Sequence, residues 1–125
     1  MPNVLLILQR DAIIQSLMAK LCNNLEIRLM VEPDHRKALV ALNSQAFKAV
    51  LIEVAESGRY DISYCLELCR ELRITVPDCK LLLMCSEQDE PSVERVIQAK
   101  SDKSIDDFVF FDVTVDYLAS KLLSL

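Results

Sequence analysis

Three segments of this sequence are unbroken runs of apolar residues with the length of a β-strand: residues 4–8 (VLLIL), 49–52 (AVLI) and 81–85 (LLLMC). A strand with one side in water alternates apolar and polar residues, whereas a strand covered on both faces does not. These runs therefore predict central strands of a parallel sheet with helices packed against both of its faces.

Segments with the apolar spacing of helices lie between these runs, and residues 25–31 and 108–111 are two further candidate strands. Five alternations of strand and helix predict an α/β fold: a single doubly wound five-stranded parallel sheet with helices on both faces, of the flavodoxin-like type. We expect residues 1–125 to form one domain, because this length leaves no room for a second core. Residues suited to an N-cap or a first helical turn are Asp11, Pro33, Asp61, Pro91 and Thr114.

Composition and charge exclude several classes of function. No apolar run reaches the ~18 residues that a membrane-spanning helix needs, and the first residues lack the basic region of a secretory signal. The 14 basic residues form no cluster and are outnumbered by 19 acidic ones, which disfavours binding to nucleic acid. We expect a cytoplasmic protein with neither membrane nor nucleic acid among its partners.

The cysteines and the single histidine do not predict a metal site. There is no CxxC pair, and His35 lies among charged residues that predict a solvated helix turn. We expect the cysteines to be reduced, buried thiols, with Cys65 and Cys69 on one helix face. We expect no cofactor either, because one glycine cannot build the phosphate cradle of a nucleotide or flavin site. The five cysteines are Cys22, Cys65, Cys69, Cys79 and Cys85.

Ligands of doubly wound sheets bind at the carboxyl ends of the strands, beside the point where the strand order reverses. The residues that follow the predicted strands are therefore the candidate pocket. They are Gln9, Arg10, Asp11, Glu53, Cys85, Ser86 and Phe111.

The order, spacing and hydrophobic register of these elements resemble the receiver domain of bacterial response regulators (CheY-like) over nearly the whole chain. The resemblance implies a role in two-component signal transduction. Members of that family carry two acids after the first strand, a phosphate-accepting Asp after the third, Thr or Ser after the fourth and Lys after the fifth. The acids hold Mg²⁺, which neutralises the transferring phosphoryl group, while the Lys and the hydroxyl bind its oxygens.

This chain departs from the family at each of those positions, although Phe108 matches the family's aromatic switch residue. Mg²⁺ requires carboxylate ligands, and the pocket offers one carboxylate opposite a positive charge. We therefore predict a pseudo-receiver that is not phosphorylated and is not an enzyme. The acid pair falls on Gln9 and Arg10, the phosphate-accepting position on Glu53, the hydroxyl on Cys85 with Ser86 next, and the Lys on Phe111.

Several alternatives remain open for this pocket. Arg10 either pairs with Glu53, which would lock the site in one conformation, or points into solvent. A register shift that turns Asp11 into the pocket would give a phosphorylatable receiver using Glu53 or Asp11. In a third alternative, Cys85 is the nucleophile of a small thiol-dependent enzyme, with Arg10 lowering its pKa.

If the chemistry is absent, the surface carries the function. The resemblance implies signalling through the fourth helix, the fifth strand and the fifth helix, by docking to a protein partner or by forming a homodimer. Phe110 is the candidate anchor, because it cannot be buried on the same side of the strand as both Phe108 and Phe111, although for any single Phe we favour burial in the core. The expected interaction face comprises Val93, Val96, Phe108, Phe110, Tyr117 and Leu118.

Overall fold

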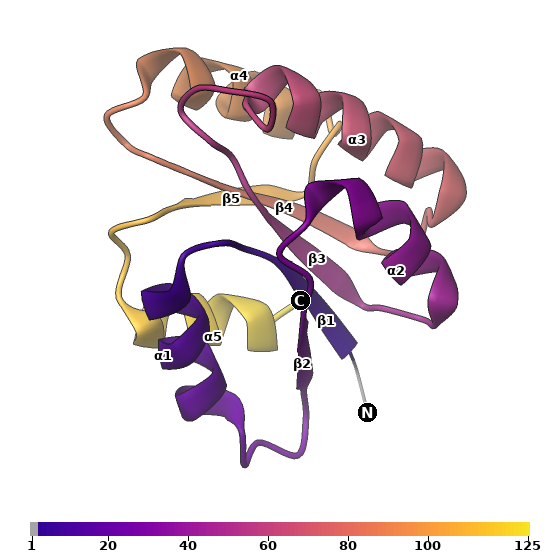
Figure 1. Cartoon of the computed structure of the whole chain (residues 1–125), viewed down its shortest axis with the longest axis vertical. Helices are drawn as coiled ribbons and strands as arrows, with labels where there is room; N and C mark the ends of the chain where they lie inside the picture. The colour runs from indigo at the N-terminus through magenta and orange to yellow at the C-terminus, as the bar shows by residue number, and fades with distance from the viewer. Residues whose placement is uncertain (1–2) are drawn as a thin grey trace.

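The computed structural model describes residues 3–125 and has the predicted alternation of strands and helices (Figure 1). All strand pairs are parallel, and the strand order in the sheet is β2-β1-β3-β4-β5. The elements are β1 (Asn3–Ile7), α1 (Asp11–Leu21), β2 (Arg28–Val31), the 3₁₀-helix η1 (His35–Lys37), α2 (Ala38–Ser44), β3 (Ala49–Glu53), α3 (Ile62–Thr75), β4 (Lys80–Cys85), α4 (Glu90–Ser101), β5 (Asp107–Phe110) and α5 (Val115–Leu123).

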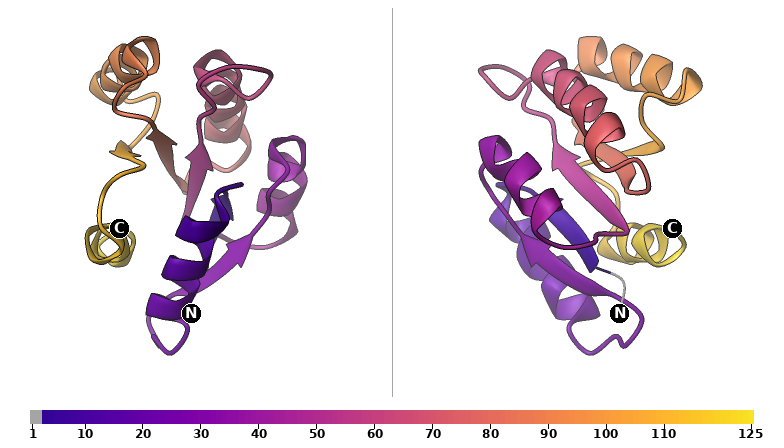
Figure 2. Two further views of the ribbon diagram at one scale, coloured as in Figure 1. Left: turned by 60° about the vertical axis from the view of Figure 1, so that its left-hand side comes forward. Right: turned by 90° about the vertical axis from the view of Figure 1, so that its right-hand side faces the viewer.

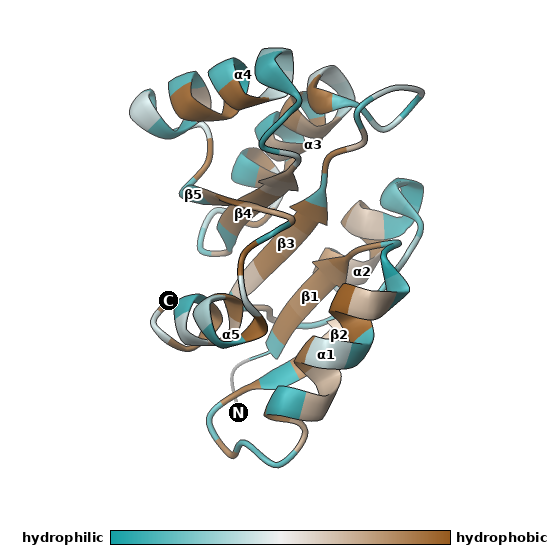
Figure 3. Ribbon diagram, turned by 90° about the vertical axis from the view of Figure 1, so that its left-hand side faces the viewer, coloured by the Kyte–Doolittle hydropathy of each residue, from teal (hydrophilic) through white to brown (hydrophobic). Residues whose placement is uncertain are grey.

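Helices cover both faces of the sheet, with α2, α3 and α4 on one side and α1 and α5 on the other (Figures 1 and 2). Successive residues of a strand point to opposite faces, so each central strand contributes to two separate cores. Along β3, Val50 and Ile52 belong to the core with α2–α4, and Leu51 belongs to the core with α1 and α5. The central strands are accordingly hydrophobic along their length, whereas the helices carry both hydrophobic and hydrophilic bands (Figure 3).

In the central pair of parallel strands, Leu5 lies opposite Val50 and Ile7 lies opposite Ile52. Two of the predicted caps are also present. The Asp61 carboxylate accepts a hydrogen bond from the backbone N–H of Tyr64, and the Thr114 hydroxyl accepts one from Tyr117. These caps satisfy backbone donors at the starts of α3 and α5.

Three local predictions are wrong. Asp11 is the first residue of α1 rather than its N-cap, which is Arg10 and makes no side-chain capping bond. Pro33 does not open an α-helix, because Asp34 instead caps the 3₁₀-helix η1 by accepting a hydrogen bond from Arg36. Strand β2 begins only at Arg28, because the preceding residues form a turn.

Four cysteines are buried as expected, but Cys22, at the end of α1, is exposed. Cys65 and Cys69 both face the core beneath α3. Desolvation raises the pKa of Cys69 to about 12 and that of Cys79 to about 11. Across residues 3–125, none of the helices has the length and hydrophobicity that crossing a membrane requires.

Candidate functional site

The strand order reverses between β1 and β3, so the chain leaves these neighbouring strands toward opposite faces of the sheet and opens a crevice at their carboxyl ends. Glu53 is the last residue of β3, and Gln9 and Arg10 stand between β1 and α1. Phe111 follows β5 directly. The topology therefore gathers four of the predicted pocket residues at one edge of the sheet.

Glu53 is 9% exposed, and its carboxylate binds groups of the same chain. Its Oε1 accepts hydrogen bonds from the backbone N–H of Gln9 at 3.0 Å and of Arg10 at 3.2 Å. These two bonds tie the β1–α1 loop to the end of β3. The carboxylate is thus a structural acceptor that satisfies partly buried backbone donors.

Arg10 lies between Glu53 and Phe111. Its Nε is 3.8 Å from Glu53 Oε2, and its guanidinium carbon is 3.7 Å from the centroid of the Phe111 ring. The side chain of Arg10 is 49% exposed, so the ion pair is loose and the aromatic ring is its closer neighbour. Of the two alternatives for Arg10, the structure adopts the ion pair, and it adds a cation–π contact at the family's lysine position.

Gln9 and Asp11 do not add oxygen ligands to this site. The Gln9 side chain donates to the backbone oxygen of Pro33 at 3.1 Å. Asp11 is exposed at the start of α1, where a negative charge favours the helix dipole. The shifted acidic pocket is therefore not formed, because Asp11 is exposed as the first residue of α1.

Cys85 and Ser86, at the end of β4, make none of the contacts described for Glu53. Cys85 is fully buried, and desolvation, with a contribution from Asp89, raises the pKa of its thiol to about 11. A nucleophilic cysteine needs a lowered pKa, so this environment opposes the thiol-enzyme alternative. The Ser86 hydroxyl donates to Gln88 Oε1 at 3.2 Å and accepts a bond from the Gln88 N–H, within its own loop.

His35 was expected on a solvated turn, and this expectation is wrong. It is 2% exposed, and its Nε2 donates to the backbone oxygen of Glu53 at 2.7 Å. Its ring stacks on that of Tyr60, with centroids 4.5 Å apart. The β3–α3 loop brings Tyr60 there through Gly58, whose φ of +91° is a conformation that glycine tolerates. His35 thus holds the backbone of Glu53 in place through this hydrogen bond.

Sequence reasoning missed His35 because its neighbours in sequence are charged, whereas its neighbours in space come from β3 and the following loop. Tyr64, in the first turn of α3, packs edge-on against the rings of His35 and Tyr60, and burial raises the pKa of its hydroxyl. The local sequence contains no signal for this contact beyond the pair of tyrosines that flank Asp61 at the start of α3.

The residues at this edge do not fit Mg²⁺. Mg²⁺ takes several oxygen ligands, and proteins usually supply one or two carboxylates that are free to bind it. Glu53 offers the carboxylate at the family's phosphate-accepting position, and its oxygens already contact two backbone N–H groups and the Arg10 guanidinium. Nowhere in residues 3–125 do three or more Asp, Glu, His or Cys side chains gather with the geometry of a metal site.

The predicted interaction face is only partly exposed. Val96 and Leu118 are 0% and 2% exposed, so they belong to the two cores and cannot contact a partner directly. Tyr117 is 52% exposed and is accessible to a partner. The accessible part of this face therefore consists of Tyr117 and the half-buried side chains of Val93, Phe108 and Phe110.

The phenylalanines of β5 follow the alternation of the strand. Phe108 and Phe110 lie on the same side, against the core of α2–α4, with ring centroids 5.7 Å apart in an edge-on arrangement. Phe111 lies past the strand, packs against the other core and lies under Arg10. All three are half-buried, so Phe110 is neither an isolated exposed anchor nor a fully buried core residue.

Solved structures of receiver domains share this fold. The receiver domain of a Francisella response regulator is 22% identical with a TM-score of 0.74, and the match covers 98% of this chain and 96% of that one. An orphan response regulator of H. pylori is 14% identical with a TM-score of 0.78, covering 98% and 94%. A structure described as adenylate cyclase from Rhodopirellula baltica is 13% identical with a TM-score of 0.79, covering 98% and 84%.

These likenesses, together with the strand order and the helix layers, establish that the chain has the CheY-like receiver fold. At identities of 10–22% they define the fold alone. No protein-family model and no curated protein matches the sequence. The function must therefore be argued from the site and the surface of this chain.

Proposed function

We propose that this protein is a receiver-like signalling module that acts by binding a protein partner, without phosphorylation and without catalysis. The observation that carries the proposal is the engagement of Glu53. Both of its carboxylate oxygens contact groups of the β1–α1 loop, namely the N–H groups of Gln9 and Arg10 and the Arg10 guanidinium. A phosphate-accepting carboxylate must instead be free to attack a phosphoryl donor.

Charge also supports the proposal. Phosphoryl transfer to a carboxylate places several negative charges together, and it needs cations that are present before the reaction. The family supplies Mg²⁺ and a lysine for this purpose. Here Arg10 is the cation next to Glu53, and the lysine position holds Phe111, which carries no charge. A phosphorylated Glu53 would therefore lack most of the compensation that stabilises it in a working receiver.

The remaining parts of the proposal concern place and assembly. We place the protein in the cytoplasm, because four buried cysteines with free thiols are typical of a reducing compartment. We assign partner binding to the accessible part of the α4–β5–α5 face, including Tyr117, with a homodimer through that face as an alternative partner. Sedimentation velocity over a range of concentrations distinguishes a dimer from a monomer.

The test is incubation of the whole chain with acetyl phosphate and Mg²⁺, followed by intact-mass measurement. We expect no gain of a phosphoryl group. A positive control is the variant that restores the family residues, Gln9→Asp, Arg10→Asp, Glu53→Asp and Phe111→Lys. A stoichiometric phosphoryl gain by the unaltered protein would overturn the proposal. Loss of that gain in Glu53→Gln or in Asp11→Asn would then identify the acceptor.

A further inference from the structure

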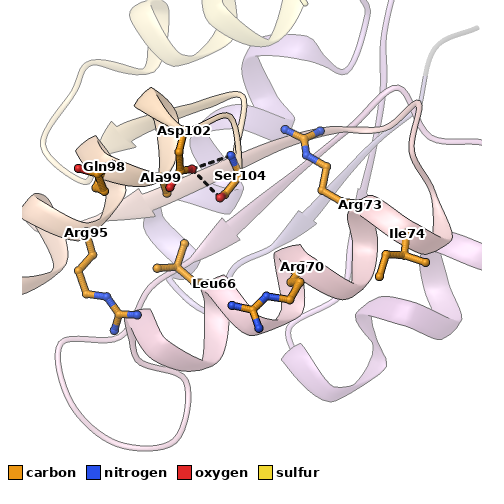
Figure 4. Close-up of a pocket in the computed structure, with 9 residues that line it drawn as sticks. All are labelled: Leu66, Arg70, Arg73, Ile74, Arg95, Gln98, Ala99, Asp102 and Ser104. Atoms are coloured by element: carbon orange, nitrogen blue, oxygen red, sulfur yellow. Dashed lines mark hydrogen bonds between the residues drawn. The ribbon is translucent and has the colours of Figure 1, made fainter.

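A groove with a volume of about 460 Å³ lies between α3 and α4 (Figure 4). Its floor is apolar, because Leu66 points from α3 toward α4 and Ala99 lies opposite it. Ile74 stands at one end of the groove and is 81% exposed. The residues that line the groove are Leu66, Arg70, Arg73, Ile74, Arg95, Gln98, Ala99, Asp102 and Ser104.

Three arginines surround this apolar floor, against one lining carboxylate. Arg73 is committed to the fold, since it pairs with Asp106 at 3.0 Å and donates to the backbone oxygen of Lys103. Arg70 and Arg95 are not held by such contacts with the fold, and their guanidinium groups flank Leu66 in Figure 4. These two side chains are the groups that a ligand in the groove would meet.

The present contacts of Arg70 and Arg95 are easily exchanged. Arg70 is 3.4 Å from Glu67 in a pair whose side chains are 75% and 61% exposed, and such pairs contribute little to stability. Arg95 donates to the Ser63 hydroxyl at 2.6 Å, and within residues 3–125 it has no carboxylate in ion-pair range. A carboxylate of a bound protein can therefore replace Glu67 as the partner of Arg70, and a second one can form an ion pair with Arg95.

We propose that this groove binds a short acidic segment of a partner protein, in which one apolar side chain is flanked by carboxylates. The apolar side chain would cover Leu66, a further apolar residue of the segment would reach Ile74, which lies ~12 Å further along α3, and the carboxylates would pair with Arg70 and Arg95. Arginine is the residue best suited to bidentate carboxylate recognition. The inference gives the proposed docking role a partner class and a second surface, separate from the α4–β5–α5 face.

The overall charge favours a peptide over nucleic acid as the occupant. The chain carries a net charge of −5, which repels a polyanion at long range, whereas a short segment meets only the local field of the groove. An exposed apolar residue such as Ile74 also has no partner on a phosphate backbone, but it adds buried area against an aliphatic side chain.

The test is a fluorescence-anisotropy titration of the whole chain with a short dye-labelled peptide in which leucines are flanked by glutamates. We expect saturable binding that weakens about tenfold in the Arg70→Ala, Arg95→Ala double variant and about threefold in Ile74→Ser. The matched control is Arg28→Ala, which removes an exposed arginine on the opposite edge strand and should change binding by less than about twofold.

Three results would overturn the inference. These are no saturable binding up to about 1 mM, equal binding by the double variant and by Arg28→Ala, and equal binding of a peptide whose glutamates are replaced by lysines. Tighter binding of a short RNA, lost in the same double variant, would overturn it in favour of a nucleic-acid site. Failure here leaves the phosphoryl test unaffected, so the groove and the proposed function can fail separately.

Discussion

At the scale of single residues, the one extra methylene of glutamate relative to aspartate explains the hydrogen bonds that Glu53 makes. Glu53 is longer than the aspartate that the family places here, so its carboxylate reaches the N–H groups of Gln9 and Arg10. The placement of strand ends put Arg10, Glu53 and Phe111 in one candidate pocket, but it left open whether Arg10 pairs with Glu53 and gave no contact between Arg10 and Phe111. The position of His35 was not predictable, because it depends on a stacking partner 25 residues further along the chain, Tyr60.

We predict that Glu53→Ala lowers the free energy of unfolding by about 1–3 kcal/mol, because two backbone N–H groups lose their acceptor. Glu53→Gln keeps an acceptor oxygen and loses only the ion pair with Arg10, so its effect should stay below about 1 kcal/mol. Urea unfolding measures both, with exposed Glu56→Ala as the control. Equal losses for Gln and Ala would show that charge, rather than the backbone bonds, determines the contribution of Glu53.

At the scale of elements, the apolar runs predicted the central strands well, because a strand covered by helices on both faces is apolar along its length. Boundaries that depend on turns were less predictable, as the late start of β2 and the 3₁₀-helix before α2 demonstrate. Strand β5 shows why the interaction face was only partly predicted. Asp107, its first residue, pairs with Lys100 of α4 and with Lys121 of α5, so the two helices are fixed to this edge. The apolar pattern does not predict these ion pairs.

We predict that Asp107→Asn lowers the free energy of unfolding by about 1 kcal/mol at neutral pH. Burial alone would raise the pKa of Asp107, but hydrogen bonds from Lys121 and Lys100 bring it below its usual value. Its stabilising effect is therefore complete above the usual aspartate pKa and is lost as the pH falls through the lowered one. Unfolding curves at pH 7 and in acid measure this, and the difference from the unaltered chain should vanish in acid. Exposed Asp112→Asn is the control.

At the scale of the whole molecule, two cores on either side of one sheet account for the buried thiols. Cys65, Cys69, Cys79 and Cys85 all belong to the core beneath α2–α4, and desolvation raises the pKa of each of them. Sequence composition predicted burial for these four, since they lie in apolar segments. It failed for Cys22 because that residue follows the last buried turn of α1.

We predict that iodoacetamide at pH 8 modifies Cys22 first and Cys85 at least about a hundredfold more slowly, since a pKa of about 11 leaves little thiolate. Peptide mapping over time measures each site, and Cys22→Ser should remove the fast phase. Cys85 reacting as fast as Cys22 would revive the thiol-enzyme alternative.

The raised thiol pKa values also mean that the folded state holds more protons than the unfolded state at alkaline pH. The free energy of unfolding should therefore fall as the pH rises from about 8.5 toward 11.

The aromatic ring beneath Arg10 has a consequence for regulation under the proposed function. A guanidinium seated on Phe111 is held by the chain itself, and this contact needs no small molecule that the cell can supply or withhold. Neither kinase nor phosphatase then sets how much of the protein is competent to bind. If that function holds, the amount of complex follows by mass action from the concentrations of the protein and its partner.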